Sequence, residues 1–302
     1  MAFLEYISRY QHSYKNWIKV MYSMKKGTNP IKCKLRNGDE IAMEHDTTSY
    51  LTHFLGSKMM DAKDVIDLLS SGIIKFRYKG TELKMKLRGV DSNNEFNGDI
   101  DHVFCKEDYK FLTTKGNNVI DIGGNIGDTP IYFALNGAEK IVAIEPYPYS
   151  FEMAKYNIEI NHFQAKIQLF NAGYGQDGEI VVGNSQVNAG SNLIESTKGS
   201  IKIPIMSMKH ILEKSGFDPH APIYLKMDCE GCEYNLLHEE KETLRRFERI
   251  QIEYHYGING LDELFKELGY IVDFTNPIET YNINSSDPKM SVGFLYAKRG
   301  KS

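Results

Sequence analysis

Residues 119–128 read Val119-Ile120-Asp121-Ile122-Gly123-Gly124-Asn125-Ile126-Gly127-Asp128. An apolar, β-branched run ends in an acid, a glycine-rich turn follows, and residues 129–136 continue as an amphipathic segment. This order predicts a strand, a tight turn and a helix, the first unit of a nucleotide-binding type of α/β sheet. In such sheets the ligand lies at the carboxyl end of the strands, so the turn is an expected cofactor site.

The charge of this turn indicates which cofactor it suits. The dinucleotide fingerprint Gly-x-Gly-x-x-Gly is incomplete, because Gly124 and Gly127 fit its last two positions but Ile122 occupies the first. Asp121 also disfavours a phosphate, since two anions a few ångströms apart repel each other. S-adenosylmethionine instead offers an amino group and a sulfonium, and glycines let the backbone approach its methionine part closely.

A second acid, Glu145, ends the apolar run 141–144, about 20 residues beyond the glycines. An acid at the end of the second strand can accept hydrogen bonds from both ribose hydroxyls of a cofactor. Nicotinamide dinucleotides and S-adenosylmethionine both use such an acid, so Glu145 does not distinguish them. The choice between the two cofactors therefore depends on Asp121 and on the missing glycine.

Four motifs together resemble the FkbM family of S-adenosylmethionine-dependent methyltransferases. They are residues 121–128, Glu145-Pro146, Lys226-Met227-Asp228-Cys229-Glu230-Gly231-Cys232-Glu233, and Ile252-Glu253-Tyr254-His255. The first two motifs are shared by many class I methyltransferases, whereas the Lys-x-Asp-x-Glu-Gly block followed by Glu-x-His is much more specific. The one departure is Gly124, where the family often has Ala. The resemblance covers residues 97–299 approximately.

This pattern implies S-adenosylmethionine as the cofactor. The residues expected to bind it lie at the ends of the first three strands: Asp121, Gly123, Gly124, Asn125, Gly127, Asp128, Glu145, Pro146, Asn171 and Ala172. Asn171 and Ala172 close the third strand, where the adenine usually lies in such sheets. Tyr109 and Phe104 are candidates for covering the bound cofactor.

Strands and helices alternate after residue 118, which is typical of a doubly wound α/β sheet. The expected strands are 119–123, 140–145, 167–171, 223–227, 249–254, 270–274 and 291–297. No helix separates the last two, so they should be antiparallel. By resemblance this is the Rossmann-like class I methyltransferase arrangement, a seven-stranded, mostly parallel sheet.

The polar run 91–99 is the expected domain boundary. Residues 1–95 should form an N-terminal α+β accessory region, and residues 96–302 the S-adenosylmethionine-binding methyltransferase domain. The accessory region should contain a helix at 3–26, a hairpin at 31–43, a helix at 58–71 and a hairpin at 73–88. In the larger domain, residues 173–200 are the expected acceptor-binding lid, and residues 232–247 should form one helix.

Methyl transfer to an alcohol requires a positioned nucleophile and a group that takes its proton. Asp228 ends the strand expected beside the first one, Glu230 follows it, and Glu253 and His255 close the next strand. We expect these four residues to be catalytic. His255 or Asp228 should be the general base, and Glu230 and Glu253 should hold acceptor hydroxyls, although Glu230 would equally suit a helix cap.

Asp228, Glu230 and Glu253 are also hard oxygen ligands, and a divalent cation is the competing use of them. The family resemblance does not require a metal, and we expect none. The implied acceptor is a hydroxyl of a small molecule or a carbohydrate. Two other functions stay open: an NAD-dependent oxidoreductase, and a non-catalytic cofactor-binding protein that kept only the fold.

The bulk composition adds few constraints. The 302 residues carry a net charge of −4 and a pI near 6.2, which disfavours a nucleic-acid partner. No segment approaches the ~18 uninterrupted apolar residues of a membrane span, and no secretory signal is evident, so we expect a cytoplasmic protein. The four cysteines should then be free thiols, because Cys229-x-x-Cys232 lacks a second pair of zinc ligands. The oligomeric state is left open.

Overall fold

The structure is a computed structural model that describes the whole chain except residues 1, 88–99, 183–200, 282–287 and 301–302. It divides into two compact units, Met1–Asp108 and Tyr109–Ser302. The boundary expected at 95/96 lies outside the described residues. Phe104 belongs to the first unit, since its ring packs edge-on against Phe76 and Tyr78.

The first unit is α+β. Its elements are α1 (Ala2–Ser13), α2 (Trp17–Lys26), β1 (Ile31–Lys34), β2 (Glu40–Met43), α3 (His45–Gly56), α4 (Ala62–Ser71), β3 (Ile73–Tyr78), β4 (Thr81–Lys86) and a π-helical turn, Asp101–Lys106. Both expected hairpins are confirmed, because β1 pairs with β2 and β3 with β4, each antiparallel.

Both helix predictions for this unit were inexact, and one further helix was not predicted. The single helix expected at 3–26 is two helices, because Asn16 bonds the backbone of β1 through its side chain and Tyr14 bridges to Leu35. The helix expected from residue 58 begins only at Ala62, where Asp61 forms a capping box. The sequence analysis missed α3.

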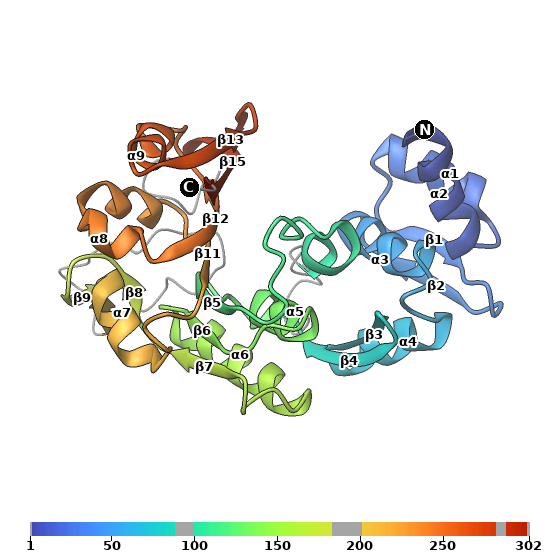
Figure 1. Cartoon of the computed structure of the whole chain (residues 1–302). Coiled ribbons are helices and arrows are strands. Elements are labelled where there is room, and N and C mark those ends of the chain that lie inside the picture. Colours follow the sequence, from blue (N-terminus) through green and yellow to red (C-terminus); the bar gives the residue numbers. More distant parts are fainter. Residues whose placement is uncertain (1, 88–99, 183–200, 282–287, 301–302) are drawn as a thin grey trace. The chain divides into compact units, whose positions relative to one another are not determined.

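The second unit contains the large sheet (Figure 1). In spatial order its strands are β13 (Tyr270–Phe274), β15 (Lys289–Arg299), β12 (Phe247–Tyr254), β11 (Ile223–Met227), β5 (Asn118–Ile122), β6 (Ile141–Ile144) and β7 (Ile167–Phe170). Only β15 runs against its neighbours. This confirms the doubly wound, mostly parallel sheet of seven strands, to which β14 (Ile278–Tyr281) adds an eighth by pairing with β15.

Helices cover both faces of this sheet (Figure 1). They are α5 (Asp128–Leu135), α6 (Pro148–Ile160), α7 (Met208–Ser215), α8 (Lys241–Leu244) and α9 (Leu261–Glu267). Every residue of β5 and β6 is buried, as expected for parallel strands with helices on either side. No helix in the described part of the chain is long and apolar enough to cross a membrane.

The segment after β11 differs from the prediction of one helix at 232–247. It is a 3-10 helix, Cys232–His238, followed by the short α8. Between them Glu239 has an extended backbone, and its Oε1 accepts hydrogen bonds from the Tyr174 hydroxyl and the Met208 amide. These bonds to another part of the fold explain the interruption.

A small sheet of β8 (Gly173–Tyr174), β10 (Ile201–Met206) and β9 (Gly178–Val182) stands beside the large one. In it β10 pairs antiparallel with β9 and parallel with β8. Most of the lid itself, residues 183–200, lies outside the described part of the chain.

A buried ion pair joins the two central strands. Asp121 on β5 and Lys226 on β11 are register partners, so their side chains extend from the same face. Lys226 Nζ lies 3.0 Å from Asp121 Oδ1 and donates a 2.7 Å hydrogen bond to the Gly123 carbonyl. Both side chains are inaccessible to solvent, at 1% and 0% exposure. The pair thus fastens the glycine turn to the centre of the sheet.

This geometry predicts a strongly non-additive mutant cycle. Lys226→Met should destabilise the protein by about 3–5 kcal/mol, because it leaves Asp121 without its counter-charge in the core. Adding Asp121→Asn should recover most of that loss. Urea unfolding of both single variants and the double variant measures the coupling, and purely additive losses would contradict the assignment.

Candidate active site

The glycine turn is packed between the ends of two neighbouring strands. The amides of Gly123 and Gly124 both donate to the Ile144 carbonyl, at 3.0 and 2.9 Å. Gly123 has a φ of +84°, and a Cβ there would lie 1.8 Å from the Asp228 carbonyl oxygen. Only glycine fits this position. At Gly124 a Cβ would meet nothing closer than 3.4 Å, so the alanine common in the family would also fit.

The residues expected to bind the cofactor gather around this turn. Glu145 accepts hydrogen bonds from the amides of Asn125 and Tyr147, at 2.9 and 3.0 Å. The Asn171 side chain donates to the Glu145 and Pro146 carbonyls, both at 2.9 Å. The ends of β5, β6 and β7 therefore form one connected edge, and the predicted contacts with a cofactor stay predictions.

The other expected cofactor residues are buried. Ala172 and Asp128 are 1% exposed, and Asp128 begins α5 directly after Gly127, whose φ is +87°. Asp121 is fully buried and its carboxylate is paired with Lys226 and accepts from the Thr129 hydroxyl. Burial raises the pKa of Asp121, and the positive charge of Lys226 partly offsets this rise. The sequence argument assigned its charge to a ligand and did not anticipate this internal partner.

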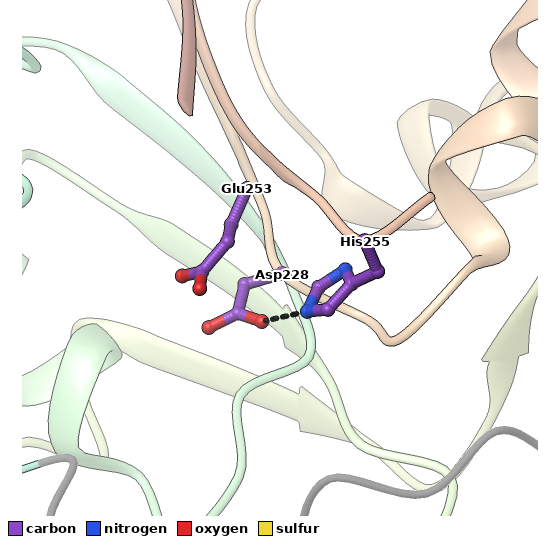
Figure 2. Close-up of side chains that lie close together, drawn as sticks. All are labelled: Asp228, Glu253 and His255. Atoms are coloured by element: carbon purple, nitrogen blue, oxygen red, sulfur yellow. Dashed lines mark ion pairs between the residues drawn. The ribbon is translucent and has the colours of Figure 1, made fainter. Parts of the chain in front are cut away.

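All four expected catalytic residues come together at the neighbouring strand ends. Met227 and Ile252 are register partners, so Asp228 and Glu253, which follow them, lie side by side. Figure 2 shows the two carboxylates beside the imidazole of His255. Its Nε2 lies 3.6 Å from Asp228 Oδ1 and 3.6 Å from Glu230 Oε2.

The His255 ring is held from behind by Glu233, a residue to which the sequence analysis gave no role. Glu233 Oε1 lies 3.1 Å from His255 Nδ1 and accepts the His255 amide at 2.8 Å. Burial alone would lower the pKa of His255, but Glu233, Glu230 and Asp228 together raise it to about 10. A pKa of about 10 leaves the imidazole protonated at neutral pH when no ligand cation is bound.

Asp228 has two further partners. The Tyr109 hydroxyl donates a 2.9 Å hydrogen bond to its Oδ2, and Lys226 Nζ lies 4.0 Å from the same oxygen. Tyr109 was expected only as a possible cofactor cover, and Phe104, the other candidate, lies in the core of the first unit. The chain offers no sequence signal for Tyr109, since it lies far from the Asp228 motif.

The cysteine prediction was wrong for one pair. Cys229 and Cys232 form a disulfide, whereas Cys33 and Cys105 are free. Between the bonded cysteines Glu230 and Gly231 both have left-handed backbone, with φ of 57° and 113°, and this turn brings the two side chains together. The disulfide therefore closes the short loop that carries Glu230 and that directly follows Asp228.

The family follows from the sequence. The sequence model of the Methyltransferase FkbM domain matches residues 121–272, half of the chain. The chain belongs to the FkbM methyltransferase family. This confirms the family resemblance of the motifs. The matched region contains the glycine turn, Glu145 and the four clustered residues Asp228, Glu230, Glu253 and His255. No curated protein matches the chain.

Three solved structures similar to this FkbM-family chain are all distant. The FkbM methyltransferase of Methylobacillus flagellatus KT is 16% identical, and the match covers 60% of this chain and 43% of that chain with a TM-score of 0.39. TYW2 of M. jannaschii, in complex with AdoMet, is 15% identical, with 76% and 87% of the two chains covered and a TM-score of 0.38. The tRNA m1G37 methyltransferase of M. jannaschii is 15% identical, with 76% and 55% covered and a TM-score of 0.41. At these values the likeness says nothing about the substrate.

Two adjacent glycines should respond oppositely to the same substitution. Gly123→Ala should destabilise the protein by more than ~2 kcal/mol, because the new Cβ collides with the Asp228 backbone at an unfavourable φ. Gly124→Ala should be tolerated, because its Cβ makes an ordinary contact. Thermal unfolding of the two variants compares them directly, and equal losses would show that the turn is not packed as described.

The disulfide predicts a definite thiol count. Unfolded without reductant, the protein should react with two equivalents of a thiol reagent, from Cys33 and Cys105, and with four after reduction. In the native protein these two should react slowly, because burial raises the pKa of each thiol to about 12. Four reactive thiols in unreduced, unfolded protein would refute the disulfide.

Proposed function

We propose that the protein transfers the methyl group of S-adenosylmethionine to a hydroxyl of a small molecule or a carbohydrate. The observation that carries the proposal is the position of the Asp228 cluster, defined as Asp228, Glu230, Glu253 and His255, directly beside the glycine turn. The Asp228 carbonyl lies against Gly123, so the expected cofactor turn and the cluster share one edge of the sheet.

The residues at this edge fit a cationic cofactor. Three carboxyl groups of the cluster lie near a single imidazole, and burial and the Asp228 charge raise the pKa of Glu253 well above its usual range, so negative charge at this edge is incompletely compensated. Such an edge attracts an ammonium and a sulfonium and repels the pyrophosphate of a nicotinamide dinucleotide. When bound, S-adenosylmethionine would supply a methyl group already activated by its sulfonium. The glycine turn, Glu145, Pro146, Asn171 and Ala172 are the proposed binding residues.

Within the cluster we assign the general base to Asp228. Its side chain is 31% exposed, whereas that of His255 is 3% exposed and already protonated at neutral pH. The Tyr109 hydroxyl donates to Oδ2 of Asp228, and Oδ1 faces the His255 ring at 3.6 Å, so both oxygens of the carboxylate have a defined orientation. Glu230 and Glu253 are proposed to hold neighbouring hydroxyls of the acceptor.

A polyhydroxylated acceptor suits this edge better than a nucleic acid does. Clustered carboxylates accept hydrogen bonds from hydroxyls, and the net charge of −4 opposes a polyanionic partner. The NAD-dependent oxidoreductase and the non-catalytic binding protein remain the competing proposals, and cofactor titration separates them from methyl transfer.

Removing the base should abolish turnover while sparing cofactor binding. Asp228→Asn should lower methyl transfer about 10²–10⁴-fold, the usual contribution of a general base. Glu248→Gln is the matched control, because it also replaces a carboxylate by an amide, and Glu248 lies at the start of the neighbouring strand β12, where it pairs with Arg299 at the surface. Calorimetry with S-adenosylhomocysteine measures binding, and mass shift on a panel of sugars and alcohols measures transfer.

Two results would contradict the proposal in different ways. Binding of NADH with no binding of S-adenosylhomocysteine would favour the oxidoreductase. Tight S-adenosylhomocysteine binding by a native protein that methylates none of the panel would favour the non-catalytic alternative.

A further inference from the structure

We propose that Asp228, Glu253 and His255 bind one divalent metal ion, and that this ion holds the acceptor hydroxyl. The sequence analysis expected no metal and considered only oxygen ligands. The structure adds the imidazole nitrogen of His255, and one ligand atom from each of the three residues lies within 4.8 Å of the others (Figure 2). The role given to the ion rests on the proposed function, whereas the binding of the ion does not depend on it.

The distances fit ligands of a common ion better than they fit hydrogen bonds. His255 Nε2 and Asp228 Oδ1 are 3.6 Å apart, too far for a good hydrogen bond. Two ligands that each lie ~2.1 Å from an ion are separated by ~3.0 Å at a right angle and by ~3.6 Å at 120°. All three ligand atoms lie within 4.8 Å of one another, so small side-chain movements would bring each of them to a common ion.

His255 is prepared as a ligand. Its ring is 3% exposed, and in the described part of the chain Nε2 has no hydrogen-bond partner, only the two carboxylate oxygens at 3.6 Å. Glu233, itself fully buried, lies against Nδ1 and can hold the proton there, so that when a metal ion displaces the proton on Nε2, the Nε2 lone pair is directed toward the carboxylates. A carboxylate behind a metal-binding histidine is the common arrangement in metal sites. Glu233 is therefore a positioning residue.

Glu253 supplies the remaining ligand. Its half-buried carboxylate makes no hydrogen bond or ion pair with any residue that the structure describes, although it stands beside Asp228. Two carboxylates and one imidazole form a mixed oxygen and nitrogen set. Such a set favours a transition ion such as Mn²⁺ or Zn²⁺ over Ca²⁺.

The ion would change how the acceptor loses its proton. With the ion bound, Asp228 would be a ligand, and the acceptor O–H would give its proton to Glu230, whose Oε2 lies 3.6 Å from Nε2. The oxygen, its charge stabilised by the ion, forms the new O–C bond as the methyl C–S bond breaks, and the electron pair of that bond remains on sulfur as a neutral thioether. Asp228 would act as the base only in the metal-free protein.

The test uses full-length protein that has been treated with EDTA and desalted. Mn²⁺ titration, followed by electron paramagnetic resonance, and Zn²⁺ titration, followed by calorimetry, should each show one ion per chain. Glu253→Gln should weaken the affinity at least ~10-fold, whereas Glu248→Gln should leave it unchanged. Binding of S-adenosylhomocysteine, measured on each variant, shows that the fold is intact, and Asp228→Asn is the second ligand variant.

The failures of the two proposals are distinguishable. Absence of stoichiometric binding of both ions, or unchanged affinity in both ligand variants, overturns the metal site. Methyl transfer that EDTA leaves unchanged overturns the role of the ion and leaves the proposed function standing. One bound Mn²⁺ in a protein that does not bind S-adenosylhomocysteine supports the site and overturns the proposed function.

Discussion

The fold and its functional edge depend on the ion pair between Lys226 and Asp121. Burying either charge alone in the centre of the sheet would be strongly unfavourable, and the pair is tolerable because the two residues are register neighbours on adjacent parallel strands. Burial alone would lower the pKa of Lys226, but Asp121 and Asp228 raise it. The ammonium therefore stays charged, and it also donates a hydrogen bond to the Gly123 carbonyl. The ion pair thus fixes the position of the glycine turn.

The ion pair also determines the position of Asp228, because the glycine turn contacts the Asp228 backbone. Gly123 lies so close to the Asp228 carbonyl that no side chain fits between them, and the Asp228 amide donates to the Ile122 carbonyl at 3.0 Å. The end of β11 is thereby set by the end of β5. A movement of the glycine turn would move Asp228, so the expected cofactor contacts and the acid cluster are mechanically one unit.

The sequence predicted the parts of this arrangement that follow from local rules. β-Branched runs gave the central strands, and parallel strands bring their carboxyl ends to one edge, which is why Asp228, Glu230, Glu253 and His255 were expected together. The reversed last strand followed from the missing helix before it. Helix limits were less accurate, because the interruption at Glu239 depends on hydrogen bonds to Tyr174 and Met208 from elsewhere in the chain.

What the sequence could not give is the choice of partner. Asp121 was predicted to face a ligand, but charge alone cannot tell whether an acid at this position faces a ligand or a lysine on the next strand. The same holds for Glu233, which belongs to a motif identified from sequence and yet acts only through its position behind His255. The bonded cysteines depend on the left-handed conformation of Glu230 and Gly231, which the free-thiol argument from cellular compartment ignores.

The charge of the Asp228 cluster is the physical reason for proposing that a cation binds beside it. Lys226 is paired with Asp121. Among the residues that the structure describes, the His255 imidazolium is therefore the main counter-charge of the cluster. A proton on Nε2 and a metal ion compete for the same lone pair, and a sulfonium beside the glycine turn would relieve the same excess without displacing either. The two proposed occupants of this edge, the cofactor and the ion, would therefore oppose each other's binding through charge, while each would bring its reacting group to the same place.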